Sequence, residues 1–160
     1  SERRDNPLLR DTWKPVFDQY RVDLVLQGHD HSYARGRSLT GEQNVVDGMN
    51  RRAGAGTVYV VSVSGAKMYR LNPDRWDAFE GVEQDRDAEN TQLFQVISID
   101  KDTLKYESYT ATGELYDAFD LVRTAGGQAN RFIERKNEAI PARYHHNTVP
   151  YHDIPPESNE

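Results

Sequence analysis

Two histidines, His29 and His31, stand one residue apart in this chain, directly after an apolar run and a glycine in VDLVLQGHDHSYARG. Only five histidines occur among the 160 residues. A glycine permits tight turning, and residues two apart on a strand share a face, so both imidazoles can reach one metal ion or a pair of ions. Neutral imidazole suits zinc, iron and similar ions. Surface or hydrogen-bonded structural histidines are the alternative, which the bare H-x-H pattern leaves open.

Other chemistries find little support in the sequence. The chain has no cysteine, which excludes disulfides, thiolate metal ligands and a cysteine hydrolase. The glycine-bearing segments GAGTV and TAGGQ lack the Lys-Ser/Thr of a phosphate-binding P-loop. The other histidines, His145, His146 and His152, lie in a proline-rich tail, where a separate metal site is the weaker interpretation.

Net charge and hydropathy limit the kinds of binding partner and the class of protein that the sequence supports. The net charge of −6 gives no electrostatic case for binding nucleic acid or an anionic membrane. No apolar stretch approaches the length of about 20 residues that a membrane span needs, and no signal peptide opens the sequence. With 36% hydrophobic and 29% charged residues, the chain is polar for a self-sufficient domain. Either much of it is irregular surface, or part of its core lies elsewhere.

Two strands and a helix would position the histidine pair. The run VDLVLQ predicts a short interior strand, apolar on both faces, and GTVYVVSVSG (56–65) predicts a second strand. Functional groups of an α/β sheet collect just past the carboxyl ends of its strands, where His29 and His31 would lie. Residues 5–20 predict a preceding helix with Asn6 as its N-cap. Pro15 interrupts that pattern and predicts a kink or a split into two short helices.

The rest of the chain predicts an antiparallel end followed by a tail. Residues 35–54 and 66–90 are interpreted as loops, the second with a helical turn around Trp76–Phe79. TQLFQVISID predicts a strand, and residues 101–123 predict a β-hairpin with its turn at Ala111–Glu114. We expect a first domain over residues 1–124. Residues 125–160 would then hold a linker, a short helix in RFIERKNEAI and an irregular proline-rich tail.

The stretch around the histidine pair resembles the last signature of the calcineurin-like metallophosphoesterases, in which a strand ends in G-H-x-H. The following Ser-Tyr-x-Arg looks most like the purple acid phosphatase branch, whose version commonly runs GHxHxYER. Ala34 stands where that branch often has Glu, so no role of that Glu is carried over. The preceding helix, the strand GTVYVVSVSG and the closing hairpin are similar too, and the resemblance covers roughly residues 5–122.

The resemblance implies an α/β (α+β) fold, of which this chain is the C-terminal half of a four-layer α/β/β/α sandwich ending in an antiparallel β-hairpin. It implies a metal-dependent phosphoric-ester hydrolase, a phosphatase or phosphodiesterase, that uses hydroxide activated by two metal ions. The ions would be divalent or trivalent Fe, Zn or Mn. By position, His29 would ligate the second metal ion and His31 the first.

Three residues near the histidine pair, Asp30, Tyr33 and Arg35, each have more than one candidate role. The position of Asp30 varies in the family, so a solvent-facing or supporting role is favoured over that of a third ligand. Tyr33 is expected to pack, with a hydrogen bond from its hydroxyl group. Arg35 either steadies a carboxylate or approaches a substrate phosphate, and we favour the structural role. Both Tyr33 and Arg35 remain candidates for supporting the metal ligands.

The family's other ligands do not occur in this sequence, which has no Asp-x-His, no Gly-Asp pair and no Gly-Asn-His. We hypothesise that Ser1 lies just after the family's single upstream histidine and that a missing N-terminal half carries the other ligands. Two histidines leave most coordination positions to water, so the chain alone is expected to hold little or no metal and to be inactive. A non-catalytic fragment or degenerate domain with a packing or binding role is the alternative.

Expected partners follow from the same resemblance. The substrate would be a phosphate ester. An isolated half of the sandwich would expose an apolar face of its sheet. We therefore expect the chain to be ordered only as a homodimer, through strand exchange or together with the retained N-terminal half. Bacterial enzymes of this branch are usually exported, which implies a secreted or periplasmic location.

Overall fold

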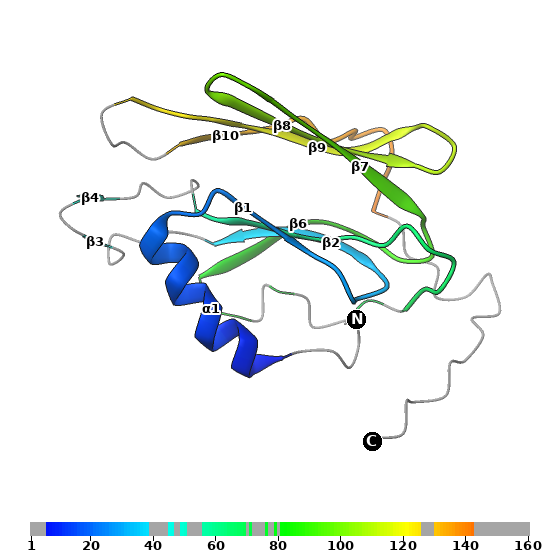
Figure 1. Cartoon of the computed structure of the whole chain (residues 1–160). Coiled ribbons are helices and arrows are strands. Elements are labelled where there is room, and N and C mark those ends of the chain that lie inside the picture. Colours follow the sequence, from blue (N-terminus) through cyan, green and yellow to red (C-terminus); the bar gives the residue numbers. More distant parts are fainter. Residues whose placement is uncertain are drawn as a thin grey trace.

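One helix and two four-stranded sheets form three layers in the computed structural model of this chain. The helix covers one face of the first sheet, and the second sheet covers the other face (Figure 1). The expected α+β class is therefore confirmed, whereas the fourth layer stays a prediction. The structure describes residues 6–38, 45–46, 49–50, 56–69, 71, 76, 79, 81–125 and 130–142.

Helix α1 (Pro7–Tyr20) begins as the sequence predicts. The side chain of Asn6 accepts a hydrogen bond from the backbone N–H of Leu9, at 3.1 Å, and Pro7 occupies the first turn. The predicted split at Pro15 is wrong, because the helix continues through that residue. Two i to i+4 contacts hold the turns on both sides together. Trp13 stacks on Phe17, with ring centroids 5.9 Å apart, and Lys14 bonds Asp18 at 2.7 Å.

The first sheet has the strand order β1-β5-β2-β6. Strand β1 (Leu24–Gln27) pairs in parallel with β5 (Val58–Val61), while β2 (Tyr33–Ser38) lies antiparallel to both β5 and β6 (Val82–Ala88). The strands β1 and β5 are confirmed, but β1 is not interior, since within the described residues it lies at the sheet edge. The apolar side chains of β1 indicated that both faces of the sheet are covered there. They do not indicate whether a second strand pairs with its free edge.

Two stretches predicted as loops contain strands of this sheet. Strand β2 begins within the signature stretch and runs into the segment 35–54, and β6 lies within 66–90. Both strands bury charged side chains, Arg35 in β2 and Arg86 with Asp87 in β6, so neither shows an apolar alternation. The predicted turn at Trp76 is present, because the N–H of Phe79 donates to the carbonyl of Trp76 at 2.9 Å.

The second sheet has the strand order β10-β9-β8-β7 and is antiparallel throughout. Its strands are β7 (Leu93–Asp100), β8 (Thr103–Thr110), β9 (Leu115–Val122) and β10 (Arg131–Glu134). The hairpin β8–β9 turns at residues 111–114, as predicted. The predicted helix in RFIERKNEAI is wrong, because its first four residues form β10, where Phe132 stacks on Phe119 of β9 with centroids 5.4 Å apart.

Two short strands, β3 (Val45–Val46) and β4 (Met49–Asn50), pair with each other. Most of the predicted linker and the tail from residue 143 onward lie outside the described residues, as does the remainder of the segment between β2 and β5. The division into domains therefore stays a prediction. In the described part, no helix is long and apolar enough for a membrane span.

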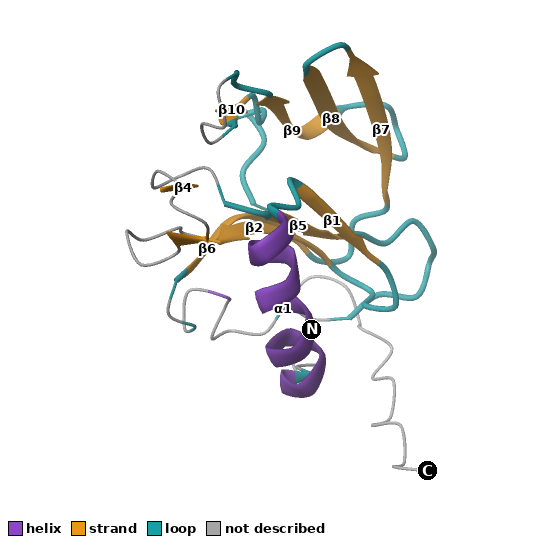
Figure 2. Cartoon of the chain, turned by 60° about the vertical axis from the view of Figure 1, so that its left-hand side comes forward, coloured by secondary structure: helices purple, strands orange, loops and turns teal. Residues whose placement is uncertain are grey.

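The main core fills the space between the two sheets. Side chains from both sheets meet there, mostly valines and aromatic residues, and the buried members are Tyr33, Val58, Val60, Ala88, Leu93, Tyr106, Tyr116, Phe119 and Leu121. The outer strands β1 and β7 lie on the same side of the stacked sheets (Figure 2). Both expose apolar side chains there, with Leu26 56% and Ile99 73% exposed.

Candidate functional site

The loop that follows β1 carries the histidine pair. This strand ends at Gln27, as expected, and Gly28 follows it. The left-handed backbone conformation belongs to His29, which has φ of 71°, and not to Gly28. A positive φ in a residue other than glycine is uncommon and costs free energy. The side chain of His29 is exposed at this bend.

His31 is held by the loop that follows β5. Its Nδ1 lies 2.8 Å from the carbonyl oxygen of Lys67, and its own carbonyl accepts a hydrogen bond from the N–H of Tyr69 at 2.8 Å. The rings of His31 and Tyr69 meet edge to face, with centroids 4.7 Å apart. A carbonyl oxygen only accepts hydrogen bonds, so Nδ1 carries a proton, and in the neutral ring the lone pair then belongs to Nε2. Metal-bound histidines commonly have this arrangement.

Asp30 fixes the backbone between the two histidines. Its Oδ1 accepts a hydrogen bond from the backbone N–H of His31 at 2.8 Å. This contact gives the carboxylate a structural role in the loop, in line with the supporting role that we favoured. A direct role as a ligand is a separate question, because a carboxylate keeps further lone pairs when one oxygen accepts a single bond.

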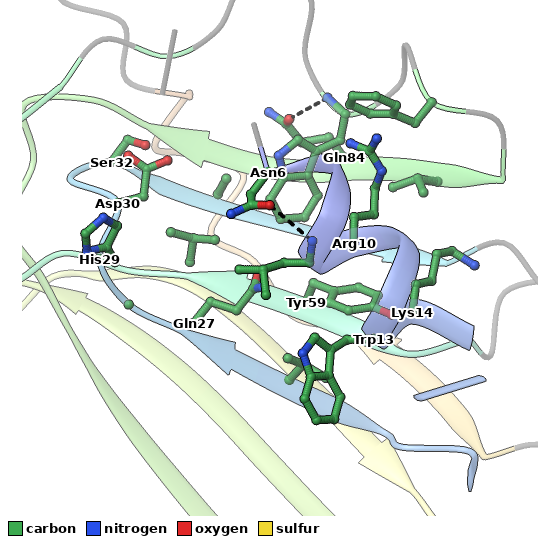
Figure 3. Close-up of a pocket in the computed structure, with 18 of the residues that line it drawn as sticks. Asn6, Arg10, Trp13, Lys14, Gln27, His29, Asp30, Ser32, Tyr59 and Gln84 are labelled. Carbon is green, nitrogen blue, oxygen red and sulfur yellow. Dashed lines mark hydrogen bonds between the residues drawn. The ribbon is translucent and has the colours of Figure 1, made fainter. Parts of the chain in front are cut away.

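A cavity of about 670 Å³ lies beside His29, between α1 and the first sheet. Figure 3 shows His29, Asp30 and Ser32 at one end of it, and Arg10 and Trp13 of α1 at the other. The polar end lies where the parallel strands β1 and β5 finish, the place at which α/β sheets commonly bind ligands.

The ligand set within the described residues is incomplete. No group of three or more His, Asp or Glu side chains there is arranged to hold a metal ion. The residues present are thus two imidazoles from one loop, which suit a transition metal by type. A complete metal site would need ligands from outside this loop.

Comparison with known proteins gives distant similarity only. The protein named "Probable inactive purple acid phosphatase 24" of Arabidopsis thaliana is 28% identical over 127 residues, covering 74% of this chain and 19% of that protein. The chain is distantly related to a protein of purple acid phosphatase type. Two uncharacterized proteins from two strains of Mycobacterium tuberculosis are each 54% identical over 33 residues, covering 21% of this chain and 6% of theirs.

The chain spans less than a fifth of the length of these relatives. No family model matches the chain, and no solved structure matches it. The purple acid phosphatase type in the relative's name agrees with the resemblance drawn from the signature stretch, but that name also describes the relative as inactive.

Tyr33 and Arg35 lie in the interface between the sheets. Arg35 is fully buried and bonds Asp117 of β9 through two nitrogens, Nε at 2.7 Å and Nη2 at 3.1 Å. It also reaches Asp85 at 2.9 Å and Glu134 at 2.6 Å. The Tyr33 hydroxyl donates to Asp117 at 2.7 Å. The structural role favoured for both residues agrees with these contacts.

Burial and partners change the acidity of this cluster. Burial raises the pKa of Tyr33 well above its usual value, and the negative charge of Asp117 adds to the effect. Burial alone would lower the pKa of Arg35, but its bonds and charge interaction with Asp117, and its bond with Glu134, raise it overall. Burial raises the pKa of Asp85, and the charges of Arg35 and Arg37 oppose that rise. Asp117, Asp85 and Glu134 therefore stabilise the charged form of Arg35.

Sequence reasoning missed the groups that orient His31. The carbonyl of Lys67 is a backbone atom and has no sequence signal. Tyr69 lies just after the glycine that closes the strand GTVYVVSVSG, and only the parallel pairing of β1 and β5 brings that loop beside His31. A rule that loops after neighbouring parallel strands meet at one edge would have indicated the contact.

Proposed function

We propose that this chain forms the C-terminal part of a metal-dependent phosphoric-ester hydrolase and supplies His29 and His31 as two of its metal ligands. The observation that carries the proposal is the bond between Nδ1 of His31 and the carbonyl of Lys67, which leaves Nε2 as a lone-pair donor at the strand ends. The distant similarity to a purple acid phosphatase-type protein supports the same reaction class.

Two metal ions held at this edge would supply a hydroxide near neutral pH and a clamp for the phosphoryl group. The chain's own residues have simpler tasks. His31 would hold one ion with a ring whose orientation Lys67 and Tyr69 fix, and His29 would hold the other from its strained bend. Asp30 would keep the two imidazoles at a constant spacing through its bond to the backbone of His31. The substrate class is the phosphate esters.

The remaining ligands would come from a preceding half of the same domain. Support comes from the exposed apolar side chains of the outer strands β1 and β7, which a further pair of strands would cover. The relatives are more than five times as long as the stretches that match, so they have room for such a half. By resemblance, the whole protein would be exported from the cell.

A non-catalytic role is the second candidate. The relative's name describes it as probably inactive, and the described residues of this chain hold no set of three metal ligands. In that case the fold would have a packing or binding role. His31 would then only form its structural hydrogen bond with the carbonyl of Lys67. The two candidates differ in whether the longer protein binds metal.

The test uses the longer protein that contains this chain. Elemental analysis after purification without chelator should find two metal ions per molecule, and the protein should hydrolyse p-nitrophenyl phosphate in a metal-dependent manner. His31→Ala should remove activity and lower the metal content, whereas His152→Ala, a histidine in the tail, should change neither. Absence of bound metal together with absence of turnover would decide for the non-catalytic role.

A further inference from the structure

We propose that the cavity between α1 and the first sheet binds the aromatic alcohol part of the phosphate ester. This inference rests on the proposed function and adds a substrate class to it. The cavity measures about 670 Å³, within the range of roughly 300–1,000 Å³ that is usual for small-molecule sites. It is therefore large enough for a substituent of one or two fused rings.

Aromatic rings from separate elements line this cavity. Helix α1 contributes Trp13 and Phe17, strand β5 contributes Tyr59, and the segment between β5 and β6 contributes Trp76 and Phe79. Phe17 contacts Tyr59 with ring centroids 6.2 Å apart, which joins the helix wall to the sheet wall. Flat rings on several walls favour a flat aromatic guest over an aliphatic chain, because offset and edge-on ring contacts add to the burial of apolar surface.

Part of the sheet side of the cavity consists of small apolar side chains, which leave room for a guest beside the larger Tyr59 and Gln84. The residues facing it from the sheet include Val25, Ala34 and Val61. Gly36 lets the ring of Trp76 lie directly on strand β2, because a Cβ there would be 2.5 Å from that ring. Any larger residue at position 36 would push the ring away, so this wall depends on the glycine.

Polar side chains of the histidine loop and the end of β1 form one end of the cavity, while Asn6, Lys14 and Gln84 add polar groups along its other walls. Gln27, His29, Asp30 and Ser32 line that end (Figure 3). An ester whose phosphoryl group lies beside His29 would direct its alcohol part along the aromatic walls. On the helix side, the guanidinium of Arg10 lies 4.3 Å from the centroid of the Phe79 ring, a stacked pair that offers a second flat surface.

The test uses the two tryptophans of this chain, both of which line the cavity. Proton–nitrogen correlation spectra of the full 160-residue chain give one indole signal for each. Naphthol and naphthyl phosphate should shift both indole signals saturably, whereas inorganic phosphate and glycerol phosphate should shift neither. Absence of a saturable shift with both aromatic compounds would overturn the proposal, as would equal shifts with glycerol phosphate.

A cavity-filling variant supplies the control. Val61→Phe places a ring in the cavity and should abolish the shifts, while Val96→Phe makes the same change on β7 of the other sheet and should leave them intact. Binding to Val61→Phe as strong as to the unaltered chain would count against the site. These measurements need no turnover, so a failure of the hydrolase proposal would appear as missing activity in the longer protein, with the binding result unaffected.

Discussion

Arg35 and Asp117 form a two-pronged ion pair that joins the two sheets. Their atoms meet at 2.7 Å and 3.1 Å, and both side chains are fully buried. The pair links β2, which directly follows the histidine loop, to β9 of the closing hairpin. It therefore fixes where the strand after His31 lies relative to the second sheet. The stacked rings of Phe119 and Phe132 both lie near the guanidinium, which is 5.4 Å and 5.6 Å from their centroids.

Removal of Arg35 should destabilise the chain more than removal of the charge on Asp117. Arg35→Met leaves Asp117 buried without a cation, which should cost about 3–5 kcal/mol of unfolding free energy. Asp117→Asn leaves Arg35 its bonds to Asp85 and Glu134, so the loss should be smaller, about 1–3 kcal/mol. Chemical denaturation of both variants measures the difference.

Arg37→Met is the matched control for that comparison. Arg37 lies two residues along the same strand and pairs with Glu83 and Asp85, but its side chain is partly exposed. Its loss should cost no more than about 1 kcal/mol. If Arg35→Met were no worse than this control, the buried pair would not be holding the sheets together.

Alkaline pH should destabilise the fold through Tyr33 and Tyr106. Burial is the main cause that raises the pKa of each phenol above its usual value of 10.0. A raised folded-state pKa gives stability that is complete below the unfolded pKa and is lost as pH rises through the folded pKa, because the unfolded chain releases its protons first. The unfolding free energy should therefore fall from about pH 10 upward.

Tyr106→Phe should reduce the slope of that fall. The measurement is the unfolding free energy from denaturant titrations at a series of alkaline pH values, with phenolate absorbance recorded alongside. Tyr20→Phe, which alters a phenol that is 72% exposed on α1, should leave the slope unchanged. A Tyr106→Phe slope equal to that of the unaltered chain would show that the buried phenols are not its source.

The sequence predicts elements that carry an apolar run or an apolar periodicity. Helix α1, the strands β1, β5 and β7, and the hairpin β8–β9 are of this kind. Strands β2 and β6 were missed because buried positions in them hold Arg35, Arg86 and Asp87. The two arginines bond Asp117 and the carbonyl of Tyr116, which lie far along the chain. Strand β10 was missed because its helical pattern in sequence gives way to pairing with β9 and stacking of Phe132 on Phe119.

For the candidate site, the sequence predicts the residue types but not the backbone conformation that those residues adopt. The pair of histidines and their place after β1 follow from VDLVLQGHDH. Gly28 was expected to permit a tight turn, whereas the positive φ belongs to His29. Which residue of a Gly-His pair takes the turn depends on where the next strand begins, and β2 had not been predicted. The cavity beneath α1 likewise depends on Trp76, which reaches the sheet only because Gly36 lies in a buried strand.

His29→Gly should lower metal binding without lowering the stability of the fold. Glycine adopts the φ of 71° without strain, so the variant should unfold at equal or higher denaturant concentration, with a gain of up to about 1 kcal/mol. The same change removes an imidazole, so the longer protein should lose metal. His29→Val should lose metal as well and should also be destabilised, because a β-branched residue tolerates this conformation poorly.

Denaturation curves and elemental analysis of both variants test this prediction. The expected pattern is that the two variants share the loss of metal and differ in the sign of the stability change. Unchanged metal content in His29→Gly would remove His29 from the ligand set. A destabilised His29→Gly would show that the His29 side chain contributes to the fold.

Charge placed on the outer strands should keep this chain monomeric. Strands β1 and β7 each have one hydrogen-bonded neighbour in the described sheets, and they expose Leu26 and Ile99. Without a covering half, such edges pair with other copies, so the unaltered chain should associate as its concentration rises.

The double variant Leu26→Lys with Ile99→Lys should lower that association, because charged side chains on an edge oppose strand pairing. Thr112→Lys adds a charge in the exposed hairpin turn and should not. Sedimentation over a range of concentrations measures the effect, and a chain that stays monomeric and unfolds cooperatively would contradict it.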